Sequence, residues 1–259
     1  MTTRFDLMVA PNGARKTKAD HPALPTSPAE LAETARACGE AGATAIHVHV
    51  RDADGGHSLD AGAYRAVVAA IRAASDLRVQ ITTEAAGIFD VAAQIACLRA
   101  GLAPEASVAL REIERAPDRL AECYRAADQA GVEVQHILYA PDDLTRLLSL
   151  LEASTIPEHF TRVLFVLGRY TEGQRSAPED LDPFLDALGG APLTWSVCAF
   201  GPREQDCLMH AIRRGGQVRI GFENNHIAPD GTPFADNAAA VSALVAAAAA
   251  EGYEPERNA

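Results

Sequence analysis

The sequence alternates eight strand-like runs with amphipathic helical segments, and this alternation restricts its fold more than any other feature. The runs are short, apolar and rich in β-branched residues, and they span 5–10, 45–50, 78–83, 106–110, 132–138, 162–167, 193–199 and 217–222. Helical segments rich in Ala, Leu and Arg lie between them, as at 27–41, 61–74, 91–100, 119–130 and 203–214. Eight strand–helix units without a break in composition fit one closed barrel better than an open doubly wound sheet. We therefore predict a single-domain (β/α)8 TIM barrel over residues 1–259.

The ends of the predicted helices carry their own signals. Ser27-Pro28-Ala29-Glu30 is a capping box with proline at the first helical position. Glycines follow several helical segments directly before the next strand, at positions 42, 101, 131 and 215. With 48% hydrophobic residues, a chain of 259 residues buries a large core.

Charge and cysteine content exclude several classes of partner and location. The formal net charge of −12 argues against nucleic acid and against an anionic membrane surface. The alanine-rich segment 238–250 is too short to span a bilayer, and the first ten residues, with Arg4 and Asp6, do not resemble a signal peptide. Five cysteines without a CxxC pair indicate a reducing compartment. We predict a cytoplasmic protein.

Two histidines lie two residues apart in the second strand-like run. Because side chains alternate along a strand, His47 and His49 point to the same side, and Ile46 and Val48 point to the other. Such a pair presents two nitrogen ligands to one metal ion. The spacing alone also fits two hydrogen-bonded core histidines, so a third ligand is needed.

The last strand-like run offers that ligand. Alternation sends Arg219, Gly221 and Glu223 into the barrel at its carboxyl end, where TIM barrels hold their active sites. Glu223, beside a glycine that leaves space, completes a His2Glu set with one open position, which is typical of catalytic zinc. The plainer alternatives are a surface carboxylate for Glu223 and a salt bridge that closes the barrel for Arg219.

The third strand-like run and the first long loop add polar groups. Gln80, Thr82 and Glu84 are expected to point inward, and the hydroxyls of Thr82 and Thr83 suit a polar substrate. The polar, basic segment 11–25 is expected to form a loop over the barrel mouth. Cys198 also faces inward, where a small buried thiol explains it better than a nucleophile.

These motifs, taken in order, resemble those of the β-keto acid cleavage enzymes. The resemblance is carried by Pro22-Ala23-Leu24-Pro25, Glu40-Ala41-Gly42-Ala43, His47-Val48-His49-Val50-Arg51-Asp52, Asp54-Gly55, Gln80-Ile81-Thr82-Thr83, Phe165-Val166-Leu167-Gly168, Thr194-Trp195-Ser196-Val197 and Val218-Arg219-Ile220-Gly221-Phe222-Glu223-Asn224-Asn225. It implies a zinc-dependent, usually tetrameric TIM barrel that condenses a β-keto acid with acetyl-CoA to give acetoacetate and a new CoA ester. It also implies that His47, His49 and Glu223 bind zinc. Arg219 and Thr82 would then bind substrate, and Arg219 would stabilise developing negative charge.

Three positions depart from the family pattern. Asn224 stands where well-known members have an aspartate proposed as general base. An amide keeps the hydrogen-bonding reach but takes no proton near neutral pH, so we expect Asn224 to bind substrate and not to act as the base. Arg15 aligns with an acidic residue that reads the substrate's amino group, so we expect amine-bearing substrates to be disfavoured. Glu84 replaces a glycine; it is a candidate base, with zinc-bound hydroxide as the other, unless it simply pairs with Arg15.

Two other functions fit the same residues. One is a zinc lyase or hydrolase that acts on a β-dicarbonyl acid without CoA. The other is a barrel that binds a metal and a small acid without turnover.

Overall fold

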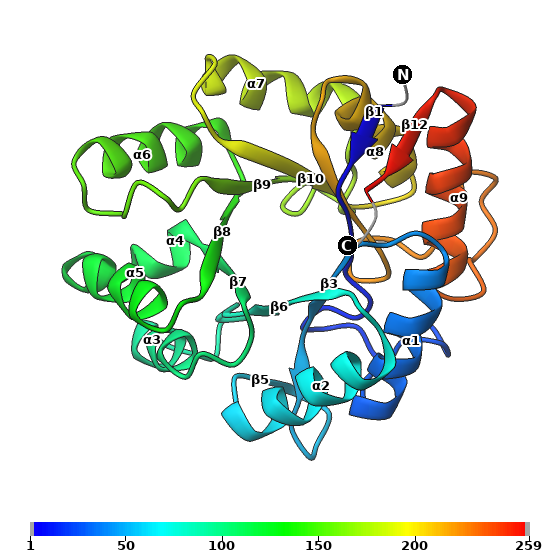
Figure 1. Ribbon diagram of the computed structural model, residues 1–259. Coiled ribbons are helices and arrows are strands. Elements are labelled where there is room, and N and C mark those ends of the chain that lie inside the picture. The colour runs from blue at the N-terminus through cyan, green and yellow to red at the C-terminus, as the bar shows by residue number, and fades with distance from the viewer. Residues whose placement is uncertain (1–2, 257–259) are drawn as a thin grey trace.

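The computed structural model describes residues 3–256 and forms a closed, eight-stranded parallel barrel (Figure 1). Around the barrel the strands follow the order β10-β11-β2-β3-β6-β7-β8-β9. Their bounds are β2 (Leu7–Val9), β3 (Ala45–Val48), β6 (Arg78–Thr82), β7 (Glu105–Ala109), β8 (Glu133–Leu138), β9 (Arg162–Leu167), β10 (Thr194–Ala199) and β11 (Gln217–Ile220). Seven of them lie within the predicted strand-like runs, and β7 begins one residue before its run. The single-domain (β/α)8 prediction is confirmed.

Helices surround the barrel (Figure 1). They are α1 (Pro28–Glu40), α2 (Ala61–Ala74), α3 (Val91–Arg99), α4 (Leu110–Ile113), α5 (Leu120–Gln129), α6 (Pro141–Glu152), α7 (Asp182–Leu188), α8 (Glu204–Arg213) and α9 (Asn237–Ala250), with 3-10 turns at Pro117–Arg119 and Pro178–Leu181. The predicted capping box is present at α1, where the Ser27 side chain accepts from the Glu30 N–H. The glycines that end α3 and α5, Gly101 and Gly131, both have positive φ, as a helix C-terminus that turns into a strand requires.

Two small sheets lie outside the barrel. Strand β1 (Thr3–Phe5) pairs in parallel with β12 (Tyr253–Pro255) and so joins the two ends of the described chain beside α9 (Figure 1). Strands β4 (Val50–Arg51) and β5 (His57–Ser58) form a short antiparallel pair directly after the two histidines. This pair carries the chain outward from His49 before α2 begins.

Strand alternation divides the apolar core into two layers. The larger layer lies between strands and helices and contains Ile46, Val48, Val218 and Ile220. A separate, smaller cluster uses the alternate residues of β7–β10 and therefore lies inside the barrel; its members are Ala109, Ile137, Leu164, Val166, Cys198 and Phe200. Toward the carboxyl ends of the strands, the barrel interior is thus apolar on the β8–β10 side and polar on the β3–β6 side; Gln135 of β8 and Ser196 of β10 are polar and lie one inward position before Ile137 and Cys198.

Within residues 3–256, no helix has the length and apolar character needed to cross a bilayer. All five cysteines are buried and free.

Candidate active site

His47, His49 and Glu223 converge at the carboxyl ends of the barrel strands. Nε2 of His47 and Nε2 of His49 are 3.2 Å apart, and they lie 3.7 Å and 3.5 Å from Oε2 of Glu223. Ligand atoms on one tetrahedral zinc ion, at bonds of 2.0–2.2 Å, would be about 3.3–3.6 Å from one another. The three atoms therefore have the spacing of three ligands to one ion.

Hydrogen bonding selects the metal-binding form of His47. Its Nδ1 lies 2.7 Å from Oε1 of Gln80, so Nδ1 carries the proton and Nε2 keeps a free lone pair. The Gln80 amide is oriented in turn, because it donates to Gln135, which donates to Ser196. Burial lowers the pKa of His47 to about 3, which keeps the imidazole neutral.

Glu223 is ionised and one of its oxygens is unused. Burial favours the neutral acid, but Arg219, with Nη2 3.2 Å from Oε1, holds the pKa of Glu223 well below its usual value. Among the described residues, its buried Oε2 has no hydrogen-bond partner. An orphaned carboxylate oxygen that faces two imidazole nitrogens fits a metal ligand and leaves no reason to place Glu223 on the surface.

The way Glu223 reaches the site differs from the prediction. Strand β11 ends at Ile220, and Glu223 follows in a turn, where its N–H donates to Ala10 O at 3.0 Å. Gly221 has φ +141°, and a Cβ there would lie 2.5 Å from Ala10 O. The prediction that this glycine leaves space beside Glu223 is therefore wrong, because the backbone of Ala10 fills that space.

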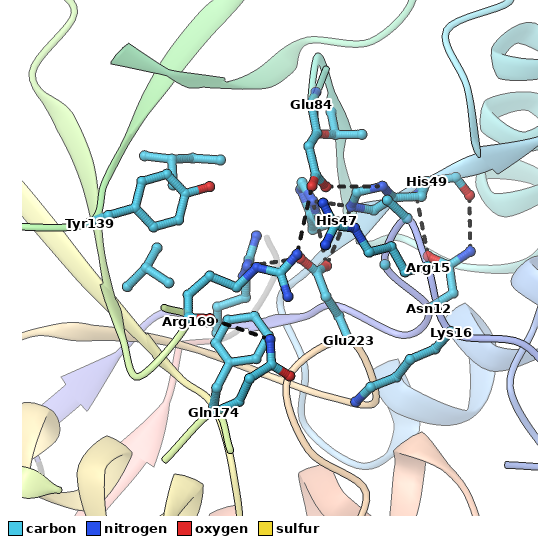
Figure 2. A pocket seen from close by; sticks show the side chains of 17 residues that line it. Asn12, Arg15, Lys16, His47, His49, Glu84, Tyr139, Arg169, Gln174 and Glu223 are labelled. Carbon is cyan, nitrogen blue, oxygen red and sulfur yellow. Dashed lines mark hydrogen bonds and ion pairs between the residues drawn. The ribbon is translucent and has the colours of Figure 1, made fainter. Parts of the chain in front are cut away.

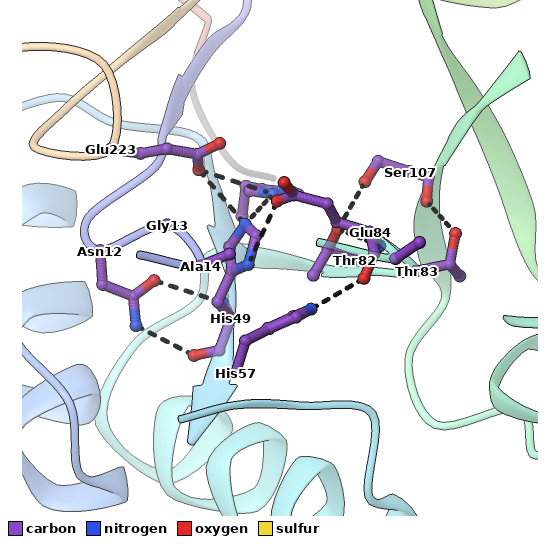
Figure 3. Close-up of polar contacts among 12 residues, drawn as sticks. Asn12, Gly13, Ala14, His49, His57, Thr82, Thr83, Glu84, Ser107 and Glu223 are labelled. Atoms are coloured by element: carbon purple, nitrogen blue, oxygen red, sulfur yellow. Dashed lines mark hydrogen bonds and ion pairs between the residues drawn. The ribbon is translucent and has the colours of Figure 1, made fainter. Parts of the chain in front are cut away.

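A cavity of about 290 Å³ opens beside the three ligands (Figure 2). Four further residues that the sequence analysis selected line it: Arg15, Thr82, Glu84 and Arg219. Residues 12–16 of the first long loop form part of its wall, as predicted. Arg51 donates to backbone carbonyls of this loop, including Lys16 O at 2.9 Å, and Asn12 donates to His49 O at 2.9 Å (Figure 3). The loop is thereby tied to the strand that carries the histidines.

Glu84 lies between the histidines and the opposite wall. Oε2 is 3.8 Å from Nδ1 of His49, and Oε1 is 3.9 Å from Nη2 of Arg169. Its backbone is held by Thr82, whose Oγ1 accepts from Glu84 N–H at 3.0 Å, and by His57, whose Nε2 lies 2.8 Å from Glu84 O (Figure 3). Within residues 3–256, its ion pairs are with His49 and Arg169, so the alternative salt bridge to Arg15 is not formed.

Two residues expected to bind substrate are turned away from the cavity. Thr83 follows Thr82 by one position and so lies on the opposite strand face, where its hydroxyl donates to Ser107 O at 2.9 Å (Figure 3). The amide of Asn224 donates at 3.3 Å to Oε1 of Glu204. Neither is among the described residues that line the cavity, which gives no support to the predicted contacts. Burial raises the pKa of Glu204 to about 8. The amide at position 224 suits this place because it can donate a hydrogen bond to the buried acid.

His136 and Cys198 serve the framework. His136 is buried between the Tyr124 hydroxyl, 3.0 Å from Nδ1, and Phe160 O, 3.1 Å from Nε2. Burial raises the pKa of the Cys198 thiol to about 11, so Cys198 is a buried thiol as expected, not a nucleophile.

The sequence analysis missed several cavity residues, chiefly Lys16, Tyr139, Arg169 and Phe200. Arg169 follows β9 by two residues, but alternation groups it with Phe165 and Leu167, which pack outward, so the rule that placed Glu84 after β6 would not have selected it. Lys16 belongs to no strand or helix; it lies in an irregular loop, and its Nζ donates to Phe222 O at 2.7 Å. No periodicity marks such a residue.

Comparison with known proteins assigns a family to this arrangement. A family profile described as "beta-keto acid cleavage enzyme" matches residues 6–259. The 3-keto-5-aminohexanoate cleavage enzyme of Acetoanaerobium sticklandii is 27% identical over 90% of this chain and 87% of its own. The 3-oxoadipate:acetyl-CoA acetyltransferase of Cupriavidus necator is 26% identical over 95% of this chain and 89% of its own.

Among solved structures, apo ObcA superposes with a TM-score of 0.74 at 16% identity. The match covers 92% of this chain but only 64% of the ObcA chain, so this protein corresponds to part of that longer one. At this identity the likeness supports the barrel fold alone.

Proposed function

The chain belongs to the β-keto acid cleavage enzyme family, and from this premise we propose that it converts a β-keto acid and acetyl-CoA into acetoacetate and a new acyl-CoA. The observation that carries the proposal is the His47–His49–Glu223 triangle, which opens onto a small cavity lined by both acids and cations. The names of the C. necator and A. sticklandii relatives, an acetyl-CoA acetyltransferase and a β-keto acid cleavage enzyme, support the reaction class.

The reaction exchanges one carbon–carbon bond for another. A base removes a proton from the carbon between the keto and carboxyl groups, and this carbon attacks the thioester carbonyl of acetyl-CoA. The C–S bond breaks and CoA leaves as thiolate, which then attacks the original keto carbon. The bond between that carbon and the former α-carbon breaks, the proton returns to the α-carbon, and acetoacetate and the new thioester result.

The three ligand residues would hold a divalent ion, and zinc suits their donor set. Bound there, it would supply Lewis acidity to the substrate's keto oxygen. Arg219 stays charged through all steps, because the neighbouring Glu223 carboxylate raises its pKa despite burial. Its guanidinium therefore stabilises negative charge that develops on substrate oxygens.

Glu84 is the base in this proposal. It is the cavity carboxylate that is not part of the ligand triangle, and the backbone bonds from Thr82 and His57 fix its position. Asn224 cannot replace it, since an amide takes no proton and this one is bound to Glu204. The Thr82 hydroxyl lies at the cavity wall, where it orients the β-keto acid substrate.

Three further assignments belong to the proposal. The homotetramer rests on the family resemblance, and the cytoplasmic location rests on the cysteine content. Acetyl-CoA enters from the barrel mouth, because the cavity is too small for the whole cofactor. A cavity of about 290 Å³ is at the lower end of small-molecule sites and suits the keto acid with the acetyl end of the thioester.

The test is to incubate the purified, metal-loaded protein with a panel of β-keto acids, with and without acetyl-CoA. We expect acetoacetate and one new acyl-CoA to appear in equal amounts, and only when acetyl-CoA is present. Consumption of the acid without acetyl-CoA would instead identify a lyase or hydrolase. Binding of the acids without conversion would indicate a non-catalytic barrel.

A further inference from the structure

The cavity wall opposite the metal ligands is apolar and ends in an arginine. Ile137, Val166 and Phe200, from the strands and strand ends of β8, β9 and β10, form this wall. At its end, the guanidinium carbon of Arg169 lies 5.0 Å from the centre of the Phe200 ring. Figure 2 shows Tyr139 and Arg169 on one side of the cavity and His49 on the other.

Arg169 has unused hydrogen-bonding capacity. Its side chain is only 19% exposed, and its nearest charged partner, Glu84, is 3.9 Å away, beyond hydrogen-bond distance. Within residues 3–256, its guanidinium donates no hydrogen bond that meets ordinary geometry, whereas Arg219 donates to Glu223 at 3.2 Å. A largely covered guanidinium with free N–H groups is a fork that fits a carboxylate.

The local charge balance also favours a second anionic group. The described residues that line the cavity include four cationic side chains and two carboxylates, namely Arg15, Lys16, Arg169 and Arg219 against Glu84 and Glu223. This excess of positive charge stands in a chain with a net charge of −12. One substrate carboxylate near the metal ligands would leave the excess only partly neutralised.

From these observations we propose that the enzyme is specific for β-keto dicarboxylic acids. The β-keto acid end lies at the metal ligands, the carbon chain lies along Ile137, Val166 and Phe200, and the second carboxylate binds Arg169. The inference rests on the proposed function and adds the substrate class to it. A phosphate of CoA offers the same anionic chemistry, and the experiment separates the two sources.

The experiment compares two acids with the same six-carbon chain, 3-oxohexanedioate and 3-oxohexanoate, in the wild-type protein and in Arg169→Gln. We expect the wild type to prefer the dicarboxylate. Arg169→Gln should lower kcat/KM for the dicarboxylate roughly 100-fold, the effect of losing a two-point charged hydrogen bond, and leave that for the monocarboxylate within a few-fold. Arg169→Lys should restore part of the difference, since it returns the charge without the fork.

Two further readouts make the result independent of folding and of turnover. Arg125→Gln, which changes an exposed arginine on α5, is the matched control and should leave kcat/KM unchanged for both acids. Calorimetric titration of both acids without acetyl-CoA should show tighter binding of the dicarboxylate, and Arg169→Gln should abolish that difference.

Three outcomes would overturn the inference. They are an equal loss of kcat/KM for both acids in Arg169→Gln, a wild-type preference for the monocarboxylate, or a rise in Arg169→Gln that is confined to the KM of acetyl-CoA. The last would assign Arg169 to a CoA phosphate. Conversion of other β-keto acids but of neither of these two would also overturn the inference and leave the proposed function standing. If no acid of the panel is turned over, the proposed function fails, and the binding comparison alone decides whether Arg169 binds a second carboxylate.

Discussion

The two sides of the cavity are built by different means. On the side of β3, β6 and β11, His47, Gln80 and Arg219 are buried and joined by hydrogen bonds and ion pairs to their neighbours. On the side of β8–β10, the side chains of Ile137 and Val166 belong to an apolar cluster, and the charged group, Arg169, stands on a loop. Buried polar networks tolerate little change, because each lost partner leaves an unsatisfied group, whereas apolar walls accept changes of shape more readily.

This difference separates two tasks. Changes on the hydrogen-bonded side should lower the turnover of every β-keto acid, because they affect groups common to all substrates. Changes on the apolar side and in the loops should alter which acid is preferred. The following predictions test this separation, from the largest expected effect to the smallest.

The largest effect is expected from His47→Ala. Loss of one of three ligands should remove the ion and lower turnover of all β-keto acids by about three orders of magnitude or more, with circular dichroism unchanged. Elemental analysis after dialysis measures the ion directly. His159→Ala, which changes a half-exposed histidine paired with Asp128, is the control and should keep full metal content. Full metal retention in both His47→Ala and His49→Ala would sink the assignment of the ligands.

Glu84→Gln should lower kcat by about 100-fold or more and leave the metal content unchanged, because the amide keeps the shape of the side chain but takes no proton. The loss should be similar for every β-keto acid tested, since the same proton is removed from each. A rate within a few-fold of the wild type would show that Glu84 is structural.

Gln80→Leu tests the hydrogen bond behind the metal ligand. Without the Gln80 carbonyl, Nδ1 of His47 loses its acceptor and the imidazole is no longer held in one tautomer. We expect metal affinity to fall by about 10- to 100-fold, measured by competition with a chromophoric chelator. Thr83→Val removes a buried hydroxyl from the other face of the same strand end and serves as control. An unchanged affinity in Gln80→Leu would show that packing alone orients His47.

Glu204 should make the stability of the metal-free protein fall as the pH rises. Its folded-state pKa of about 8 lies above the ordinary value of 4.5, so the folded state holds this proton more tightly than the unfolded state. The stabilisation is complete below pH 4.5 and is lost as the pH rises through 8. Relative to Glu204→Gln, the wild type should lose about 2 kcal/mol of unfolding free energy between pH 6 and pH 8, measured by urea denaturation. Parallel profiles for the two proteins would contradict the buried, protonated acid.

Strand periodicity explains why the hydrogen-bonded side could be predicted. The residues next to His47, Thr82 and Arg219 pack outward, so these three side chains lie inside the barrel. The alternation of apolar and polar residues in the sequence predicts both positions. The prediction became inaccurate where strands end. Gly221 and Asn224 lie in a turn after β11, so strand alternation no longer decides where they point.

The apolar side was harder to predict for a related reason. Ile137 and Val166 are typical core residues, and only the tertiary structure shows that their face of the barrel borders the cavity. Lys16 and Tyr139 lie in or next to loops, where position depends on contacts from distant segments, such as the bond from Lys16 to Phe222 O. Arg169 was missed for the same reason, because alternation from Phe165 and Leu167 would turn it outward, and only the loop after β9 brings it to the cavity.

The smallest effect is expected from Arg15, which lines the cavity from the first loop but is exposed to solvent. Its charge should repel an ammonium group on a substrate, and solvent should weaken that repulsion. Arg15→Glu should therefore raise kcat/KM for 3-keto-5-aminohexanoate by about tenfold or less, and should change that for uncharged chains of similar length much less. Arg15→Gln, which removes the charge without reversing it, should give an intermediate value. If the wild type already prefers the amine-bearing acid over the dicarboxylate, Arg15 points away from the bound substrate, and the loop takes no part in choosing it.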